Sequence, residues 1–174
     1  MIDLSGVLIA TDFSESSGAA LAEGCALAAA FGATLHVLNV ITRPLHEIWA
    51  SYAPAEEFNR LIHDLEDRAR RELDHLAAPG ALANDRVVRA TAWGDPSDEI
   101  LRYAREHDVN LIVCGTHGRR GWDRVVMGSV AERVVRLAPC PVLTVPPARG
   151  VRELSDDVRR VQRTAAAPES LLAS

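Results

Sequence analysis

The sequence predicts a single α/β domain built on a five-stranded parallel sheet, doubly wound in the order 3-2-1-4-5, with helices on both faces. Short apolar runs alternate with helical patterns along the chain, which implies parallel strands joined by right-handed crossovers. The 174 residues fit one core, and 48% of them are hydrophobic. Aromatic residues make up only 5%, which favours helices on a parallel sheet over a β-sandwich.

The expected strands are short apolar runs bounded by polar residues, glycine or proline. They are Val7–Thr11, Leu35–Val40, Val87–Ala92, Leu111–Cys114 and Val142–Val145. The last run would lie at an edge of the sheet. Because an exposed apolar edge invites strand addition, it predicts a homodimer through Val142–Val145.

Helices are expected between the strands, where capping residues precede a helical pattern and glycine or proline ends it. Ser14 or Ser16 caps the first helix, which stops at Gly32. A second helix begins near Pro54 and ends at Pro79-Gly80. Its apolar face consists of Phe58, Leu61, Ile62, Leu65, Ala69, Leu73 and Leu76.

Two further helices follow the third and fourth strands. Asp95 or Ser97 caps one of them, and Pro96 is tolerated in its first turn. The side of this helix that packs on the sheet is expected to carry Ile100, Leu101 and Ala104. The other opens at Ser129 and runs to about Leu137.

The domain is expected to span residues 1–148, followed by a tail of residues 149–174. In the tail, apolar residues recur at heptad-like spacing among arginines and acids, so a short amphipathic helix followed by disorder is expected. These residues are Val151, Leu154, Val158 and Val161.

Composition excludes several classes of function. The net charge of −5 argues against binding to nucleic acid or to an anionic membrane. No lysine occurs, which eliminates a Walker A lysine, a Schiff-base lysine and a serine–lysine dyad.

The cysteines, Cys25, Cys114 and Cys140, form no zinc pattern and are expected to be buried thiols in a reducing cytosol. No run approaches the ~20 apolar residues of a membrane helix, and no leader is recognisable, so a cytoplasmic protein is expected.

The most informative segment is Gly115-Thr116-His117-Gly118, then nine residues, then Gly128-Ser129. A glycine at a strand end permits a sharp turn, and a second glycine lets the backbone approach a ligand. The start of a helix offers amides, a hydroxyl and the positive end of the dipole to an anion. In a sheet of order 3-2-1-4-5, Asp12 and Gly115 would both face the crevice between strands one and four. The alternative is that these glycines only make turns and Ser129 only caps a helix.

The run GTHGRRGWDRVVMGSVAERVVRLAPCPVLTVPP resembles the ATP-binding branch of the universal stress protein (UspA-like) family, which is marked by this glycine and serine spacing. ATDFSESS, LHVLNV and GDPSDEILRYAREHDVNLIVCG also resemble family segments, so the resemblance covers about Val7 to Pro147. It implies the Rossmann-like fold of the adenine nucleotide alpha-hydrolase superfamily. Asn110 stands where the family often has an acid, outside the proposed pocket.

The resemblance implies a role for each matched position. Asp12 would accept hydrogen bonds from the ribose hydroxyls, Ala10 and Thr11 would line the adenosine pocket, and Val40 would meet the adenine edge. Gly115, Gly118, Gly128, Ser129 and Val130 would hold the phosphates. Magnesium could accompany the phosphates, but no dedicated carboxylate cage for it is recognisable in the sequence. The resemblance also implies the homodimer through the last strand.

Other residues have plain alternatives. Asp12 could merely cap the first helix. Arg119 could neutralise phosphate, whereas Arg120 and Arg124 fit solvated loop positions. A solvated position is also expected for His117, a surface charge for Glu132, and a loop cover for Trp122. No catalytic constellation can be argued from spacing.

The leading hypothesis is therefore an ATP-binding stress-response protein that signals to an unidentified partner, with slow hydrolysis at most. One alternative is a slow ATPase or phosphotransfer enzyme on the same scaffold. The superfamily's enzymes carry SGGxDS or a HIGH-type signature, and neither occurs here. The other alternative is an interaction module without a ligand, against which the complete glycine–serine pattern argues.

Overall fold

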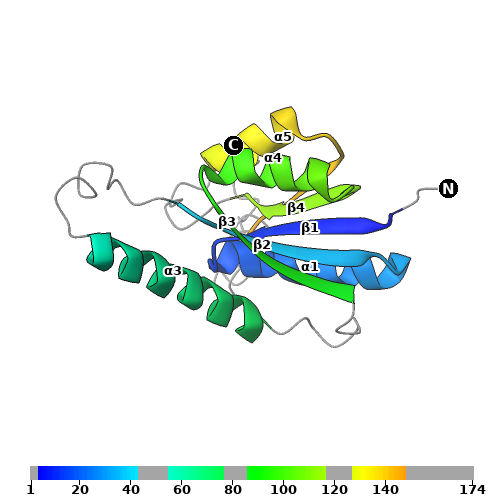
Figure 1. Cartoon of the computed structure of the whole chain (residues 1–174). Coiled ribbons are helices and arrows are strands. Elements are labelled where there is room, and N and C mark those ends of the chain that lie inside the picture. Colours follow the sequence, from blue (N-terminus) through cyan, green and yellow to red (C-terminus); the bar gives the residue numbers. More distant parts are fainter. Residues whose placement is uncertain (1–3, 43–54, 77–85, 117–126, 148–174) are drawn as a thin grey trace, which may run out of the picture.

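A computed structural model describes residues 4–42, 55–76, 86–116 and 127–147, and its centre is one parallel sheet (Figure 1). The strand order is β3-β2-β1-β4-β5, as the sequence predicts. The strands are β1 (Gly6–Thr11), β2 (Thr34–Ile41), β3 (Val87–Trp93), β4 (Leu111–Gly115) and β5 (Val142–Val145). Strand β2 is longer than the apolar run predicts, because parallel pairing to its neighbours continues from Thr34 to Ile41.

Helix α1 (Glu15–Phe31) begins and ends at the expected residues. Of the two candidate caps, Ser14 is the one used, and its side chain accepts a hydrogen bond from the Ser17 N–H at 3.3 Å. Gly32 follows the helix with φ of 67°, a left-handed conformation that glycine adopts without steric cost. The chain then enters β2 directly.

Helices cover the sheet in two layers, with α1 and α3 (Ala55–His75) on one face and α4 (Pro96–Glu106) and α5 (Ser129–Leu137) on the other (Figure 1). Alternate residues of β1 serve the two layers. Val7 and Ile9 belong to the core under α1, and Leu8 belongs to the core under α4, all fully buried. Burial on both faces explains why this strand is a continuous apolar run.

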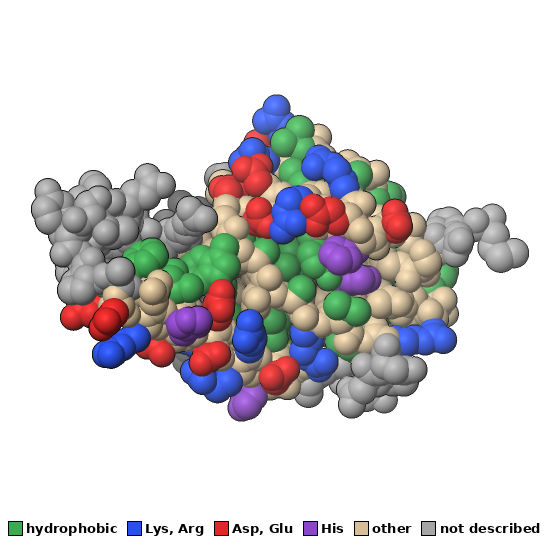
Figure 2. Space-filling view, viewed as in Figure 1, with side chains coloured by type: hydrophobic (Ala, Val, Ile, Leu, Met, Phe, Trp, Pro, Cys, Tyr) green, Lys and Arg blue, Asp and Glu red, His purple; other side chains and the backbone are tan. Residues whose placement is uncertain are grey.

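Helix α3 departs from its predicted stripe. Ala69 and Leu73 are buried, but Leu61 in the amino-terminal half is 40% exposed. Side chains tie this helix to β3: Trp93 Nε1 donates to Glu66 at 2.8 Å, and Arg89 donates to the Leu73 carbonyl at 3.1 Å. On the face shown in Figure 2, acidic and basic side chains are interspersed along the helices.

The predicted cap of α4 is confirmed. The Asp95 carboxylate accepts the N–H groups of Ser97 and Asp98 at 3.0 and 3.1 Å, and Pro96 occupies the first turn. Ile100, Leu101 and Ala104 are buried, as predicted. No helix in the described part of the chain is long and apolar enough to cross a membrane. The tail 149–174 lies outside the described residues.

Candidate functional site

The carboxyl ends of β1 and β4 lie side by side, at the point where the strand order reverses. Ala10 pairs with Cys114, so Thr11 and Gly115 end neighbouring strands. Asp12 follows Thr11 directly, and Asp12 and Gly115 therefore come to the same edge of the sheet. This is the position at which open α/β sheets bind their ligands.

The turn that carries Asp12 is held by local hydrogen bonds. One oxygen of the Asp12 carboxylate accepts the Ser14 N–H at 3.1 Å, while Ser14 itself caps α1. Asp12 therefore shapes the turn before the helix and is not the cap. Between them, Phe13 has φ of 62°, a conformation that a bulky residue adopts only when its surroundings enforce it.

Buried polar groups support this turn from the α1 side. The Phe13 N–H donates to Thr11 Oγ1, and the Thr11 hydroxyl bonds Ser17 Oγ, both at 3.1 Å. On the neighbouring strand, Asn39 Nδ2 donates to the Thr11 carbonyl at 2.8 Å. Both Thr11 and Asn39 are only 6% exposed. Asn39 is not among the predicted site residues, although an amide inside a mostly apolar strand is a signal that could have identified it.

Glycine is needed at position 115 for a reason other than the predicted sharp turn. A Cβ at this position would lie 2.6 Å from Ser16 Oγ and 3.0 Å from the Ser16 main chain. Glycine is therefore required because the first turn of α1 presses against the end of β4. The Ser16 hydroxyl is buried in this contact and has no hydrogen-bond partner among the described residues.

Helix α5 begins at the same edge of the sheet. Thr116 donates its N–H to the Val145 carbonyl at 2.9 Å, and the Gly128 N–H donates to the Thr116 carbonyl at 2.8 Å. The Gly128 amide is therefore engaged with the main chain, which differs from its expected role as a phosphate donor. Within the described residues, no side chain caps this helix. The following amides, beginning with Ser129, lie at the positive end of the helix dipole.

Apolar residues line the α4 and α5 side of this edge. Ala10, Val40 and Val130 are each only partly buried and pack against the same core cluster. Deeper in the same strands, Leu8 and Leu38 are fully buried. The sheet is thus less completely covered at its carboxyl edge than at its centre.

Part of the predicted motif lies outside the described residues. This applies to Gly118 and Arg119, and also to His117, Arg120, Trp122 and Arg124. Glu132 is exposed, as predicted, with Arg136 at 3.7 Å.

Arg133, in the middle of α5, connects this helix to the amino terminus of α4. Its guanidinium lies 2.6 Å from Asp98, 3.4 Å from the Asp95 cap and 3.2 Å from Ser97 Oγ. The Ser97 hydroxyl, helped by the neighbouring amides and by Arg133, holds the pKa of Asp95 below its usual value. Arg133 thereby links α5 to the start of α4 through half-exposed side chains.

Burial shifts the pKa values of His36 and Cys114, which lie elsewhere in the fold. His36 on β2 shares a hydrogen bond of 3.1 Å with Tyr103 Oη, and the Tyr103 ring lies 4.0 Å from that of His107. Burial first, and His107 second, lower the pKa of His36. Burial raises the pKa of the Cys114 thiol to about 11. Cys25 and Cys114 are buried as predicted, whereas Cys140 is only partly buried.

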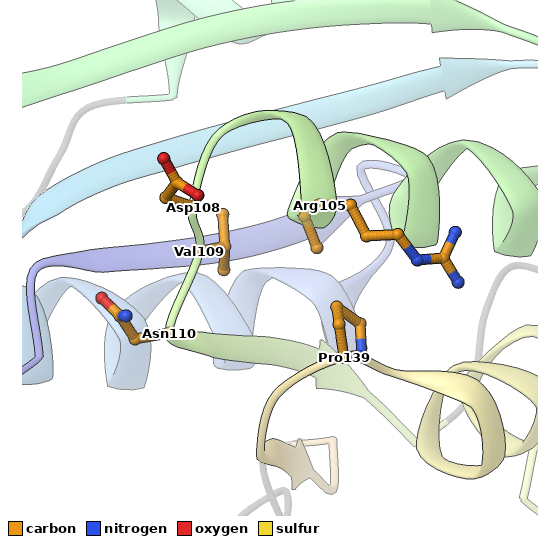
Figure 3. A pocket seen from close by; sticks show the side chains of 6 residues that line it. Arg105, Asp108, Val109, Asn110 and Pro139 are labelled. Carbon is orange, nitrogen blue, oxygen red and sulfur yellow. The ribbon is translucent and has the colours of Figure 1, made fainter.

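A shallow hollow of about 360 Å³ lies at the opposite edge of the sheet, beside the start of β4 (Figure 3). Its lining includes Arg105, Asp108 and Pro139. Asn110, also in the lining, accepts three hydrogen bonds from Ser5 and Gly6 and so joins the starts of β4 and β1. The position at which the chain departs from the family pattern is thus far from Asp12 in the fold. Within the described residues, no cluster of His, Cys, Asp or Glu could hold a metal ion.

Comparison with known proteins decides the family. The protein-family model described as "Universal stress protein family" matches residues 5–146 of the chain. The chain belongs to the universal stress protein family.

The chain matches known relatives over nearly their full length. The chain is 31% identical to universal stress protein YxiE of Bacillus subtilis over 145 residues, which are 80% of this chain and 97% of YxiE. The solved structure of MJ0577, a universal stress protein of Methanocaldococcus jannaschii, is 27% identical with a TM-score of 0.68. That match covers 86% of this chain and 100% of MJ0577.

A further relative is a universal stress protein solved in complex with cAMP. It is 26% identical with a TM-score of 0.55, and the match covers 84% of this chain and 100% of that one. The Rossmann-like fold and the family are therefore as the sequence predicts. The ligand of this universal stress protein is a separate question.

Proposed function

We propose that this universal stress protein binds an adenine nucleotide, with ATP as the preferred form, and acts as a nucleotide-dependent signalling protein. One observation carries the proposal: the Asp12 turn, Gly115 and the start of α5 meet at the point where the strand order reverses. A relative of similar fold was solved with an adenine nucleotide, cAMP. The partner that would read the bound state is unidentified.

The residues at this edge fit the parts of a nucleotide. The Asp12 carboxylate would accept the ribose hydroxyls, since a carboxylate oxygen can accept more than one hydrogen bond. Thr11 supports that turn. The partly buried Ala10 and Val40 offer an apolar wall for adenine.

The phosphates would bind at the start of α5. The amides of Ser129 and Val130 and the helix dipole favour an anion there, without any lysine. Gly115 and Gly128 contribute close main-chain packing, and Gly118 and Arg119 are proposed from the motif alone. Magnesium, if bound, would be held mainly by the phosphates and water.

A catalytic role is the weaker candidate. The site proposed here contains a cradle for anions and no nucleophile–base pair among its described residues. We therefore propose slow hydrolysis or none.

We further propose that the domain, residues 1–148, forms a homodimer through β5, which the structure places at an edge of the sheet. Leu143 on this strand is 38% exposed. A cytoplasmic location stays a prediction.

Isothermal titration of the full chain with ATP, and separately with cAMP, tests the nucleotide proposal. Saturable binding of ATP, tighter than that of cAMP, is expected. Absence of heat above dilution for both ligands would reject the proposal. Tighter binding of cAMP would reject the ATP preference and keep the nucleotide class.

A further inference from the structure

We propose that Asn39 is a positioning residue that makes the site selective for nucleotides with intact ribose hydroxyls. The inference rests on the proposed function, because it requires Asp12 to contact the ribose. It extends the proposed function by naming a residue that does not contact the nucleotide and yet determines which sugars the site accepts.

The first step is the position of Asn39 itself. It lies on the inner strand β2 with 6% of its surface exposed, in register with Thr11 of the central strand β1. A buried amide costs free energy unless its polar atoms are bonded. Asn39 Nδ2 donates to the Thr11 carbonyl at 2.8 Å, so the side chain forms a bond between the ends of two strands.

The second step is what this bond restrains. Thr11 is the last residue before Asp12, and its hydroxyl bonds Ser17 of α1 and accepts the Phe13 N–H. The main chain of Thr11 is thus held on one side by Asn39 while its side chain is held by α1. Both contacts fix the direction in which the chain leaves β1.

The third step is the strain in the turn. Phe13 has φ of 62°, which costs on the order of 1–3 kcal/mol in a non-glycine residue and persists only where the surroundings enforce it. Without the Asn39 bond, the turn can relax toward ordinary backbone angles. The Asp12 carboxylate would then lose its fixed direction, although the sheet would remain.

Loss of the Asn39 bond should therefore reduce the selectivity for the sugar and not the binding of nucleotides in general. The proposed adenine and phosphate contacts come from Ala10 of β1 and from β2, β4 and α5, and none of them passes through the turn after Thr11. Only the hydroxyl contacts depend on Asp12. An affinity ratio between a nucleotide with these hydroxyls and one without them therefore isolates the effect.

The test compares the affinities of ATP and 2′,3′-dideoxy-ATP for the full chain and for Asn39→Leu, which removes the amide and keeps a similar volume. Wild-type protein should bind ATP at least about tenfold more tightly than the dideoxy form, as one charge-assisted hydrogen bond allows. In Asn39→Leu this ratio should fall to about threefold or less, with dideoxy-ATP affinity nearly unchanged.

His36→Leu is the matched control. His36 is also a buried polar residue of β2, but it bonds Tyr103 under α4 and is remote from Thr11. It should leave the affinity ratio at the wild-type value even if it lowers stability equally. Hydrogen exchange gives a readout without ligand: Asn39→Leu should accelerate exchange at the Phe13 and Ser14 amides, and His36→Leu should not.

The outcomes separate the two proposals. Wild-type protein that binds neither nucleotide overturns the proposed function and this inference together. Wild-type protein that discriminates, beside an Asn39→Leu variant that discriminates equally well, overturns this inference alone. An equal loss of affinity for both nucleotides in Asn39→Leu would also overturn it, since that result indicates a merely structural role.

Discussion

Gly115 at the end of β4 packs so closely on Ser16 in the first turn of α1 that a Cβ would lie 2.6 Å from Ser16 Oγ. The Ser16 main chain would be 3.0 Å away and cannot rotate aside as a side chain can. This contact couples the helix after Asp12 to the strand before the glycine motif. The sequence alone did not reveal this link between the two halves of the candidate site.

We expect Gly115→Ala to destabilise the protein by about 1–3 kcal/mol, because the added methyl group must displace α1 from β4. Urea denaturation measures the change. Gly18→Ala is the matched control: nothing lies within 4 Å of its Cβ position, and alanine in a helix should stabilise by about 0.5–1 kcal/mol. Equal stability of Gly115→Ala and the wild type would contradict the packing argument.

The stability of the protein should fall as the pH drops below about 6.5. Burial lowers the pKa of His36 in the folded state, so the unfolded chain binds a proton more readily. The contribution is complete above the unfolded pKa and is lost as the pH falls toward the folded pKa. Chemical denaturation at pH 7.5 and 5.5 should show a smaller decrease in stability for His36→Leu than for the wild type. An equal decrease in both proteins would contradict the assignment to His36.

Arg133 and Asp98 should show a modest coupling energy of about 0.2–1 kcal/mol, because both side chains are about half exposed to solvent. A double-mutant cycle with Arg133→Ala and Asp98→Ala measures it by thermal or urea unfolding. The coupling should shrink at about 1 M salt, where the screening length is short. A coupling that does not change with salt would indicate packing of the arginine stem instead.

Gly118→Val should abolish ATP binding, because a β-branched side chain blocks close approach of the backbone to phosphate. Gly118 lies outside the described residues, so this prediction comes from the motif. Titration calorimetry measures the affinity, and circular dichroism confirms that the variant is folded. A folded variant with wild-type affinity would remove this segment from the proposed phosphate site.

Leu143→Arg should convert a dimer to a monomer, because it places a charge on the exposed face of the edge strand β5. Light scattering at micromolar concentration gives the mass. Val88→Arg is a suitable control, since Val88 is 40% exposed on β3, the opposite edge of the sheet. A wild-type protein with a monomeric mass would reject the proposed dimer.

Much of the fold could be predicted from the sequence because its signals are local or periodic. The run Val7–Thr11 indicates a strand buried on both faces, and Asp95-Pro96 marks a helix start through capping chemistry alone. Helix α3 was predicted less well. Its stripe is apolar along its whole length, but Leu61 remains 40% exposed, because burial depends on what the opposite surface reaches.

The sequence by itself predicted the parallel α/β class and, through its resemblance to the family, the strand order and the convergence of Asp12 with Gly115, because apolar runs, caps and motif spacing are local signals. Only the tertiary structure decided how that edge is held: Ser16 against Gly115, Asn39 on the Thr11 carbonyl, and the Gly128 amide on Thr116. Each of these contacts joins residues of different elements, and their geometry depends on how the helices pack. A sequence pattern does not give the distances between residues of different elements.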